Sequence, residues 1–182
     1  MRDVAEREAF LVLRAQTGDR EALDALLASA QEPLYRYLLT LVRERQLAED
    51  VLQETFVRVY RKLGWLREPG LFRPWAYRIA TREAFRQLKR ERRWAEQVRD
   101  EAALGAVAAP PPREEFAHEL TARLRETVAG LSPASRAVVV LYYLHEMSLE
   151  ETAAVLGVPL GTVKSRLAYG LAALRRQLRE PE

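Results

Sequence analysis

The chain has 182 residues, 48% of them hydrophobic and 30% charged, a composition typical of soluble globular proteins rather than disordered ones. It contains no cysteine, which excludes disulfides and thiolate metal sites and permits a reducing compartment. The first residues carry acidic groups and no apolar core, and no apolar run reaches the roughly 18 residues of a membrane helix. We therefore expect a cytoplasmic protein without membrane insertion.

The net charge of +3 is small but unevenly distributed along the chain. Residues 72–94 contain eight basic side chains against two acidic ones, and residues 158–179 contain five basic and no acidic ones. Residues 96–119, between these segments, carry six acidic side chains against two arginines. Two basic segments separated by an acidic one predict two separate contacts with a polyanion.

Helical periodicity dominates the N-terminal half, and strand patterns are nearly absent from the whole chain. Residues 3–16 predict a first helix that Gly18 ends, with Asp19 as the N-cap of the next helix. That second helix should extend to about residue 44, with a break around residues 31–33 because of a proline there.

The third predicted helix, about residues 46–63, has an apolar face for the core and an opposite polar face. The polar face carries Asp50, Gln53 and Glu54 beside Val57, an arrangement compatible with a protein-binding patch. Helical geometry alone favours an ordinary solvated face over such a patch.

A loop rich in large apolar side chains, residues 64–74, precedes a long helix that should end near Gln97. Basic side chains at helical spacing fall on one face of this helix, and Trp75 projects over the same arc. Like charges at this spacing repel unless a polyanion neutralises them, so we favour nucleic-acid binding over a solvated face. We call this set the basic stripe; it consists of Arg78, Arg82, Arg86, Lys89, Arg90 and Arg93.

Residues 98–115 break the helical pattern with alanines, acidic residues and a run of three prolines. This composition is typical of an extended spacer and predicts a domain boundary. We expect an N-terminal domain at residues 1–97 and a C-terminal domain at residues 116–182, joined by a flexible linker.

The C-terminal segment predicts a helix-turn-helix. Ser132, followed by proline, marks the start of one helix, and His145 is expected to supply a positive charge near its C-terminal end. Ser148 with Glu151 forms a capping box for the next helix, and Gly157 ends that helix in a left-handed conformation.

The last predicted helix, from about residue 160, has an apolar back and a polar, basic front. Such a helix suits entry into a DNA major groove, although this motif alone also allows an αα-hairpin with a solvated front. The front carries Thr162, Ser165, Arg166 and Tyr169, and Lys164 lies toward its apolar edge.

Three strings of the sequence together resemble the extracytoplasmic-function (group IV) sigma factors of bacterial RNA polymerase. Residues 48–63 (AEDVLQETFVRVYRKL) resemble sigma region 2.2, and residues 72–93 (FRPWAYRIATREAFRQLKRERR) resemble regions 2.3 and 2.4. Residues 131–167, which include the string GTVKSRL, resemble region 4. The resemblance implies an all-α protein of two small helical domains, without cofactor or enzymatic activity, that directs core polymerase to promoters and assists their melting.

The resemblance also assigns roles to particular residues. It implies that Asp50, Gln53, Glu54 and Phe56 bind the β′ clamp helices of core polymerase. It implies that Phe72, Trp75 and the basic stripe bind the −10 region of the promoter. The −35 region would be read by Thr162, Lys164, Ser165, Arg166 and Tyr169. Further expected partners are the polymerase β flap and an anti-sigma factor.

The chain departs from the family pattern within both DNA-binding segments. Arg82 and Arg86 stand where the family commonly has Asn and Asp, and Tyr169 and Leu171 stand where Arg is frequent. The promoter sequence therefore does not carry over from the resemblance.

Two other classes of protein share parts of this pattern. An autonomous helix-turn-helix regulator would use the N-terminal half for sensing or dimerisation, but the proline-rich separation and the second basic, aromatic segment speak against it. A polymerase-binding protein that never reads DNA is the other class. In that case, replacing Arg166 by alanine would leave promoter-specific transcription unchanged.

Overall fold

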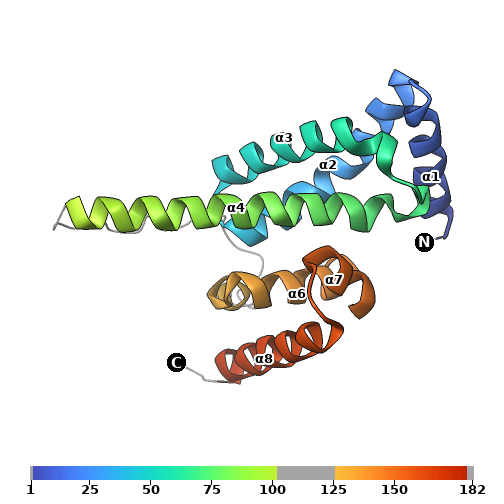
Figure 1. Cartoon of the computed structure of the whole chain (residues 1–182). Helices are drawn as coiled ribbons and strands as arrows, with labels where there is room; N and C mark the ends of the chain where they lie inside the picture. The colour runs from blue at the N-terminus through green and yellow to red at the C-terminus, as the bar shows by residue number, and fades with distance from the viewer. Residues whose placement is uncertain (1, 102–125, 180–182) are drawn as a thin grey trace, which may run out of the picture.

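The computed structural model of the chain describes residues 2–101 and 126–179, with side chains for 6–91 and 126–176. All regular secondary structure in these residues is helical, which confirms the predicted all-α class (Figure 1). None of the helices described there is both long enough and apolar enough to cross a membrane.

The N-terminal domain consists of four α-helices and two short 3-10 turns. In chain order they are α1 (Arg2–Gln16), α2 (Arg20–Val42), α3 (Arg45–Lys62), η1 (Leu63–Trp65), η2 (Pro69–Leu71) and α4 (Phe72–Glu101). In the C-terminal domain, residues 126–130 are helical. They are followed by α6 (Pro133–Tyr143), α7 (Leu149–Leu156) and α8 (Leu160–Arg179).

Helices begin at polar N-cap residues and α7 ends at a glycine, at the positions predicted from the sequence. The side chain of Asp19 caps α2, and the side chain of Ser132 caps α6. Ser148 and Glu151 form the expected capping box, with N···O distances of 2.8 and 3.0 Å. Gly157 ends α7 with a φ of 65°, the left-handed conformation that glycine adopts without strain.

Helix α2 differs from the prediction because it runs through Pro33 without a break. Proline removes one backbone donor, but Ala30, Leu34 and Tyr37 on either side of it are buried in the core. Packing of this face outweighs the missing hydrogen bond, since tertiary contacts supply most helix stability in proteins.

Helix α4 also differs, because it begins at Phe72 and continues to Glu101, past the end predicted at Gln97. Pro74 fits because the first turn of a helix does not need its backbone N–H. The remainder of the predicted spacer, and the predicted domain start at residue 116, lie outside the described residues.

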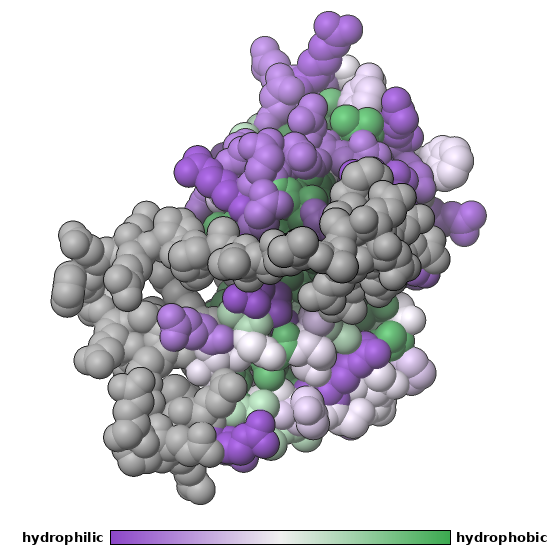
Figure 2. Space-filling view, turned by 90° about the vertical axis from the view of Figure 1, so that its left-hand side faces the viewer, coloured by the Kyte–Doolittle hydropathy of each residue, from purple (hydrophilic) through white to green (hydrophobic). Residues whose placement is uncertain are grey.

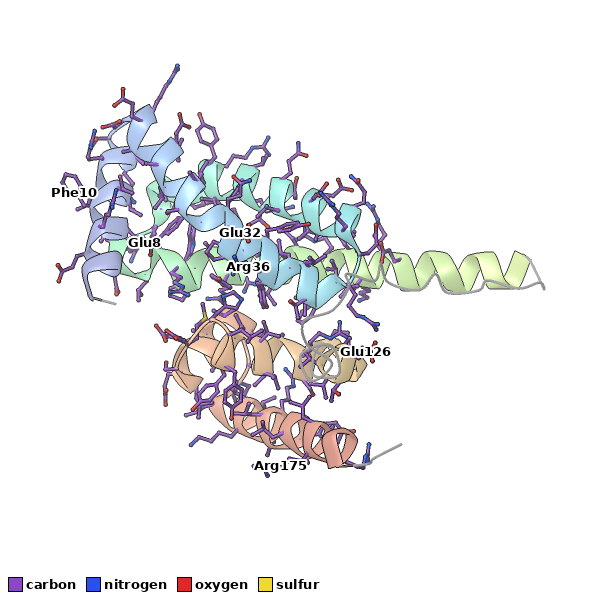
Figure 3. The ribbon with its side chains drawn as sticks, turned by 180° about the vertical axis from the view of Figure 1, so that it is seen from behind. Glu8, Phe10, Glu32, Arg36, Glu126 and Arg175 are labelled. Atoms are coloured by element: carbon purple, nitrogen blue, oxygen red, sulfur yellow. The ribbon has the colours of Figure 1, made fainter. Side chains whose placement is uncertain are left out.

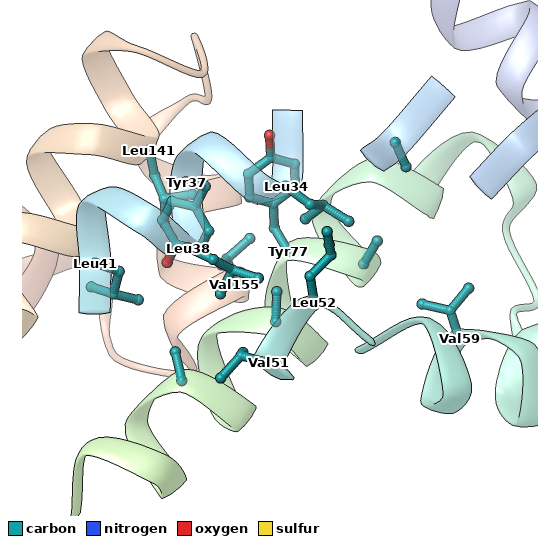
Figure 4. Close-up of a cluster of buried hydrophobic side chains, with 14 of the residues drawn as sticks. Leu34, Tyr37, Leu38, Leu41, Val51, Leu52, Val59, Tyr77, Leu141 and Val155 are labelled. Atoms are coloured by element: carbon teal, nitrogen blue, oxygen red, sulfur yellow. The ribbon is translucent and has the colours of Figure 1, made fainter. Parts of the chain in front are cut away.

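The two domains pack against each other rather than standing apart (Figure 1). Helix α7 packs on α4 and α6 packs on α2, whereas α3 covers the other side of α4. One buried cluster runs through this junction and includes Tyr37 and Tyr77 of the N-terminal domain with Leu141 and Val155 of the C-terminal domain (Figure 4). A smaller cluster around Leu131 joins α6 to α8.

Candidate nucleic-acid and protein interfaces

A groove between α3 and α4 brings two predicted sites together. Its volume is about 430 Å³, and residues from both helices line it. Three come from the predicted protein-binding patch and two from the basic stripe: Asp50, Gln53, Glu54, Arg86 and Arg90. Phe56, predicted as a fourth contact of the patch, is half-buried and packs against the core. In Figure 2 the N-terminal domain, at the top, is covered mainly by hydrophilic side chains.

A buried carboxylate, which the sequence analysis did not identify, holds this groove together. Glu83 of α4 is 3% exposed; it forms an ion pair with Arg58, whose Nε lies 2.7 Å from a carboxylate oxygen, and its other oxygen accepts from Arg86 Nη1 at 2.6 Å. Arg58 also pairs with Glu54 at 3.0 Å, so alternating charges connect α3 to α4. Within each helix, Glu54 with Arg58 and Glu83 with Arg86 stand at spacings that the sequence shows to be suitable for pairing. The pair between Arg58 and Glu83 joins two helices, so it depends on how α3 packs on α4.

The basic stripe is exposed along α4 and is mostly free of acidic partners. Arg78, Arg82, Lys89 and Arg90 are exposed, and among the described side chains only Arg86 of the stripe forms an ion pair. The side chain of Arg93 lies outside the described residues. An unpaired row of cations along one helix is an electrostatic binding surface for a polyanion.

The aromatic side chains near the start of α4 differ in exposure. Trp75 is half-buried, and its ring lies 6.2 Å from the ring of Phe72. Phe72 is only 2% exposed and supports Trp75 from the core, so its predicted contact with DNA stays a prediction. Trp65, to which the sequence analysis gave no role, is 82% exposed.

The loop that carries Trp65 is fixed by a side chain from the first helix. Gln16 of α1 donates its amide to the backbone carbonyls of Leu63 and Leu66, at 2.8 and 2.9 Å. Leu66 itself is buried in the core. The loop therefore presents an exposed indole on a supported backbone, between the end of α3 and the start of α4.

Helix α8 presents the polar front that the sequence predicted. Lys164, Ser165 and Tyr169 are exposed, while Thr162 and Arg166 are partly exposed. The hydroxyl of Ser165 bonds back to carbonyls of the preceding turn at 3.1 Å, so within the helix its proton is already engaged. On the back of the helix, Val163 and Leu174 are buried.

His145 does not supply the helix-terminal charge that the sequence analysis expected. It is 9% exposed, and its Nδ1 is hydrogen-bonded to the Tyr77 hydroxyl at 2.8 Å. Burial, with smaller contributions from Arg73 and Arg36, lowers the pKa of His145 to about 4. The imidazole is therefore neutral at pH 7. Across the described residues, no three histidine or carboxylate side chains are grouped to hold a metal ion.

These features define the class of protein: a two-domain helical protein with a basic helix in one domain and a helix-turn-helix in the other. Two family models match the chain. The model described as Sigma-70 region 2 matches residues 26–94, and the model described as Sigma-70, region 4 matches residues 128–176.

Relatives match over nearly the whole chain. The RNA polymerase sigma-H factor of Pseudomonas aeruginosa is 32% identical, over 95% of this chain and 94% of its own length. The ECF RNA polymerase sigma factor SigE of Mycolicibacterium smegmatis is 36% identical, over 90% of this chain and 64% of its own length. The structure of CnrH in complex with the cytosolic domain of CnrY is similar, with a TM-score of 0.70 at 27% identity, covering 94% of this chain and 97% of that chain.

The chain therefore belongs to the extracytoplasmic-function group of the sigma-70 family of RNA polymerase sigma factors. Its function is that of a transcription initiation factor, which directs core polymerase to promoters and is not itself an enzyme.

Proposed function

We propose that the two domains divide this function between them. The N-terminal domain, residues 1–97, binds core polymerase and the −10 region, and the C-terminal domain, residues 116–182, binds the −35 region. The observation that carries the division is the position of the exposed basic stripe, which adjoins the groove between α3 and α4. One domain thereby offers a protein-binding surface and a DNA-binding surface side by side.

The groove between α3 and α4 is the proposed docking site for the β′ clamp helices. Asp50 and Gln53 are exposed there and Glu54 is partly exposed, so carboxylate and amide oxygens face a partner. The ion pairs of Glu83 with Arg58 and Arg86 fix the groove before binding, which reduces the cost of ordering side chains on association.

The basic stripe is the proposed contact with −10 phosphates, and Trp75 the proposed wedge at strand separation. Arg78 and Arg82 have no acidic partner among the described side chains, so they gain most from a phosphate. A base turned out of the stack would meet the aromatic loop, where a flat π surface suits it.

The front of α8 is the proposed −35 reader. On this front Tyr169 is exposed and Arg166 is partly exposed, and Lys164, toward the apolar edge, is placed for a phosphate rather than a base. A linker between the two DNA-binding domains makes promoter binding bivalent, so each weak contact raises the effective concentration of the other.

We further propose that the protein acts in the cytoplasm, that its C-terminal domain contacts the polymerase β flap, and that an anti-sigma factor regulates it. The similar CnrH structure is a complex with the cytosolic domain of CnrY, which supports the last point.

Run-off transcription with core polymerase on genomic fragments tests this function. The protein should select discrete start sites, and Arg82→Ala should reduce initiation at every one of them, because it removes a phosphate contact that is independent of sequence. Arg20→Ala, which removes an exposed arginine at the start of α2, outside both proposed DNA-binding surfaces and the groove, is the matched control and should leave initiation unchanged.

Footprinting separates this function from that of an autonomous regulator. Promoter DNA should be protected only when core polymerase is present. A tight, sequence-specific footprint from the protein alone would refute the sigma-type mechanism proposed for these residues.

A further inference from the structure

The basic stripe is not a uniform row of charges. At 3.6 residues per turn, Arg78, Arg82 and Lys89 fall within about 40° of one another around α4. Arg86 and Arg90 lie about 40° and 80° beyond Arg82, and these two line the groove between α3 and α4. The first three, whose side chains are all described, do not line it. The stripe therefore divides into an outer row, Arg78, Arg82 and Lys89, and a pair beside the groove.

A buried acid holds one member of this pair. Arg86 Nη1 donates to a carboxylate oxygen of Glu83 at 2.6 Å. Glu83 is only 3% exposed, and the Nε of Arg58 on α3 lies 2.7 Å from its other oxygen. Removing a partner from a buried carboxylate is strongly destabilising, so Glu83 keeps Arg86 beside it.

Arg58 cannot replace Arg86 as the partner of Glu83, because it has a second acidic partner of its own. Its Nε also lies 3.0 Å from a carboxylate oxygen of Glu54, on the proposed polymerase-binding surface. Two acids and two arginines thus alternate from α3 to α4, and their charges cancel. If Arg86 moved to a phosphate, two carboxylates, one of them buried, would share a single arginine.

The outer row has no acid to compensate it. Among the side chains that the structure describes, Arg78, Arg82 and Lys89 form no ion pair. At 1.5 Å per residue the row is about 16 Å long, which matches about five stacked nucleotides at 3.4 Å each. Uncompensated cations release counterions when they contact phosphates, whereas an arginine already paired with a carboxylate adds little to that release.

The C-terminal domain takes no part in this ion-pair network. All four of its residues belong to α3 and α4. Figure 3 shows α3 on one side of α4 and the C-terminal domain, with Glu126 and Arg175 labelled, on the other side. The charges of the network are therefore set within the N-terminal domain.

We propose that Glu83 is a positioning residue, which keeps Arg86 from contacting DNA. The outer row makes the phosphate contacts, whereas Arg86 joins α4 to the groove that the polymerase binds. This assignment rests on the proposed function, because the stripe must be the DNA-binding surface, and it removes Arg86 from the set of proposed phosphate contacts. The ion pairs themselves do not depend on that function.

The salt dependence of binding to single-stranded DNA tests the assignment, because it counts the phosphate contacts. Binding of the full-length protein to fluorescein-labelled oligothymidine of about 12 nucleotides is followed by fluorescence anisotropy, from roughly 50 to 200 mM KCl. Each phosphate contact adds about 0.7 to the steepness of log K against log [KCl]. Arg82→Ala should therefore make the slope shallower by about 0.7, whereas Arg86→Ala should change it by less than about 0.2.

Glu83→Gln should act in the opposite direction, because a neutral amide does not hold the guanidinium of Arg86. The slope should become steeper by about 0.7, and this gain should disappear in the double variant Glu83→Gln/Arg86→Ala. Glu91→Gln is the matched control, since it removes an exposed negative charge from the same helix that is in no ion pair with a described side chain. It should change the slope by less than about 0.2.

Circular dichroism establishes that each variant is folded. If Glu83→Gln does not fold, the comparison of Arg86→Ala with Arg82→Ala decides the assignment, because both positions are exposed. Equal changes of slope for these two variants would overturn the proposal, and so would an unchanged slope for folded Glu83→Gln. Either result leaves DNA binding by the stripe standing, whereas a slope that no substitution in the stripe changes would refute that binding and the proposal with it.

Discussion

Two ionisable residues, Arg136 and His145, are buried where the domains meet. Burial, assisted by nearby Arg43, lowers the pKa of Arg136 to about 10, so its guanidinium stays charged at neutral pH. Burial lowers the pKa of His145 to about 4, so its imidazole stays neutral. The boundary therefore holds one permanent charge, stabilised by carbonyls, and one group that gains a charge in acid.

Replacing Arg136 by methionine should lower the free energy of unfolding by about 2–4 kcal/mol, because several buried carbonyls lose a charged donor at once. Urea denaturation followed by circular dichroism measures the change. Arg43→Met is the control: Arg43 is exposed and makes one hydrogen bond of 3.3 Å, so its loss should be within about 0.5 kcal/mol. Equal losses for the two variants would contradict the capping role of Arg136.

Acid should open the domain contact. The pKa of His145 in the docked state is lower than its ordinary value of 6.5, so protonation of the imidazole weakens docking. The contribution of the neutral imidazole to the free energy of docking is complete above pH 6.5. It is lost as the pH falls from 6.5 toward 4, by at most ~1.4 kcal/mol per pH unit. The groups facing the imidazole are Tyr77 and Arg73 from α4 and Tyr37 and Arg36 from α2; neither arginine can stabilise an imidazolium.

The measurement is the distance, at pH 7.5 and pH 5, between two spin labels attached at Glu21→Cys on α2 and Ala172→Cys on α8 of this cysteine-free chain. The undocked fraction should rise at pH 5. His145→Asn keeps an acceptor near the position of Nδ1 but does not titrate, so most of this pH dependence should disappear in it. A pH dependence unchanged by His145→Asn would show that another group is responsible.

Helices α6 and α8 owe their geometry to a close approach at one glycine. A Cβ added at Gly170 of α8 would lie 2.8 Å from Cγ2 of Val139 on α6, nearer than carbon atoms approach without displacement. Valine is stiff at χ1 and cannot easily turn aside. The orientation of α8 on its own domain thus depends on a residue that makes no contact with DNA in the proposed function.

Gly170→Ala should therefore destabilise the C-terminal domain by about 1–3 kcal/mol, because overpacking outweighs the gain in helix propensity. Gly161→Ala, on the same helix, has no neighbour within 4 Å of the added Cβ and should be neutral or stabilising by up to about 1 kcal/mol. Thermal unfolding of the full-length variants compares them. A melting temperature for Gly170→Ala at or above that of Gly161→Ala would contradict the close packing.

Across the whole molecule, docking and promoter binding compete for the same chain. If only the undocked state can span both promoter elements, the apparent affinity for the promoter is reduced by the undocked fraction. The energy of the domain contact thereby sets how much protein is needed for initiation, without any change at either DNA-binding surface.

Tyr77→Phe removes the hydroxyl that bonds to His145 across the domain contact, so it should lower the protein concentration that gives half-maximal run-off transcription roughly 3- to 10-fold. Titration at fixed core polymerase and promoter measures this concentration, and Tyr37→Phe should leave it unchanged. If Tyr77→Phe shifts the distance distribution but transcription still requires the same protein concentration, docking does not inhibit initiation.

Sequence by itself determined the features that depend on near neighbours. The caps at Asp19, Ser148 and Gly157 are readable because each cap bonds within a few residues of itself. The basic stripe and the front of α8 are readable because helical periodicity places their side chains on one face. Those features were enough to predict the all-α class and the helix-turn-helix, whereas the family resemblance rests on the three strings at residues 48–63, 72–93 and 131–167.

Only the tertiary structure decided what depends on residues far apart in the chain. Pro33 stays within α2 and Phe72 is buried because their surroundings come from other helices. Glu83 closes the groove only when α3 packs on α4. His145 is neutral because packing against residues far away in the chain buries it, next to Tyr77, 68 positions away. Burial and hydrogen bonding of this kind are properties of packed surfaces, which no local pattern of residues encodes.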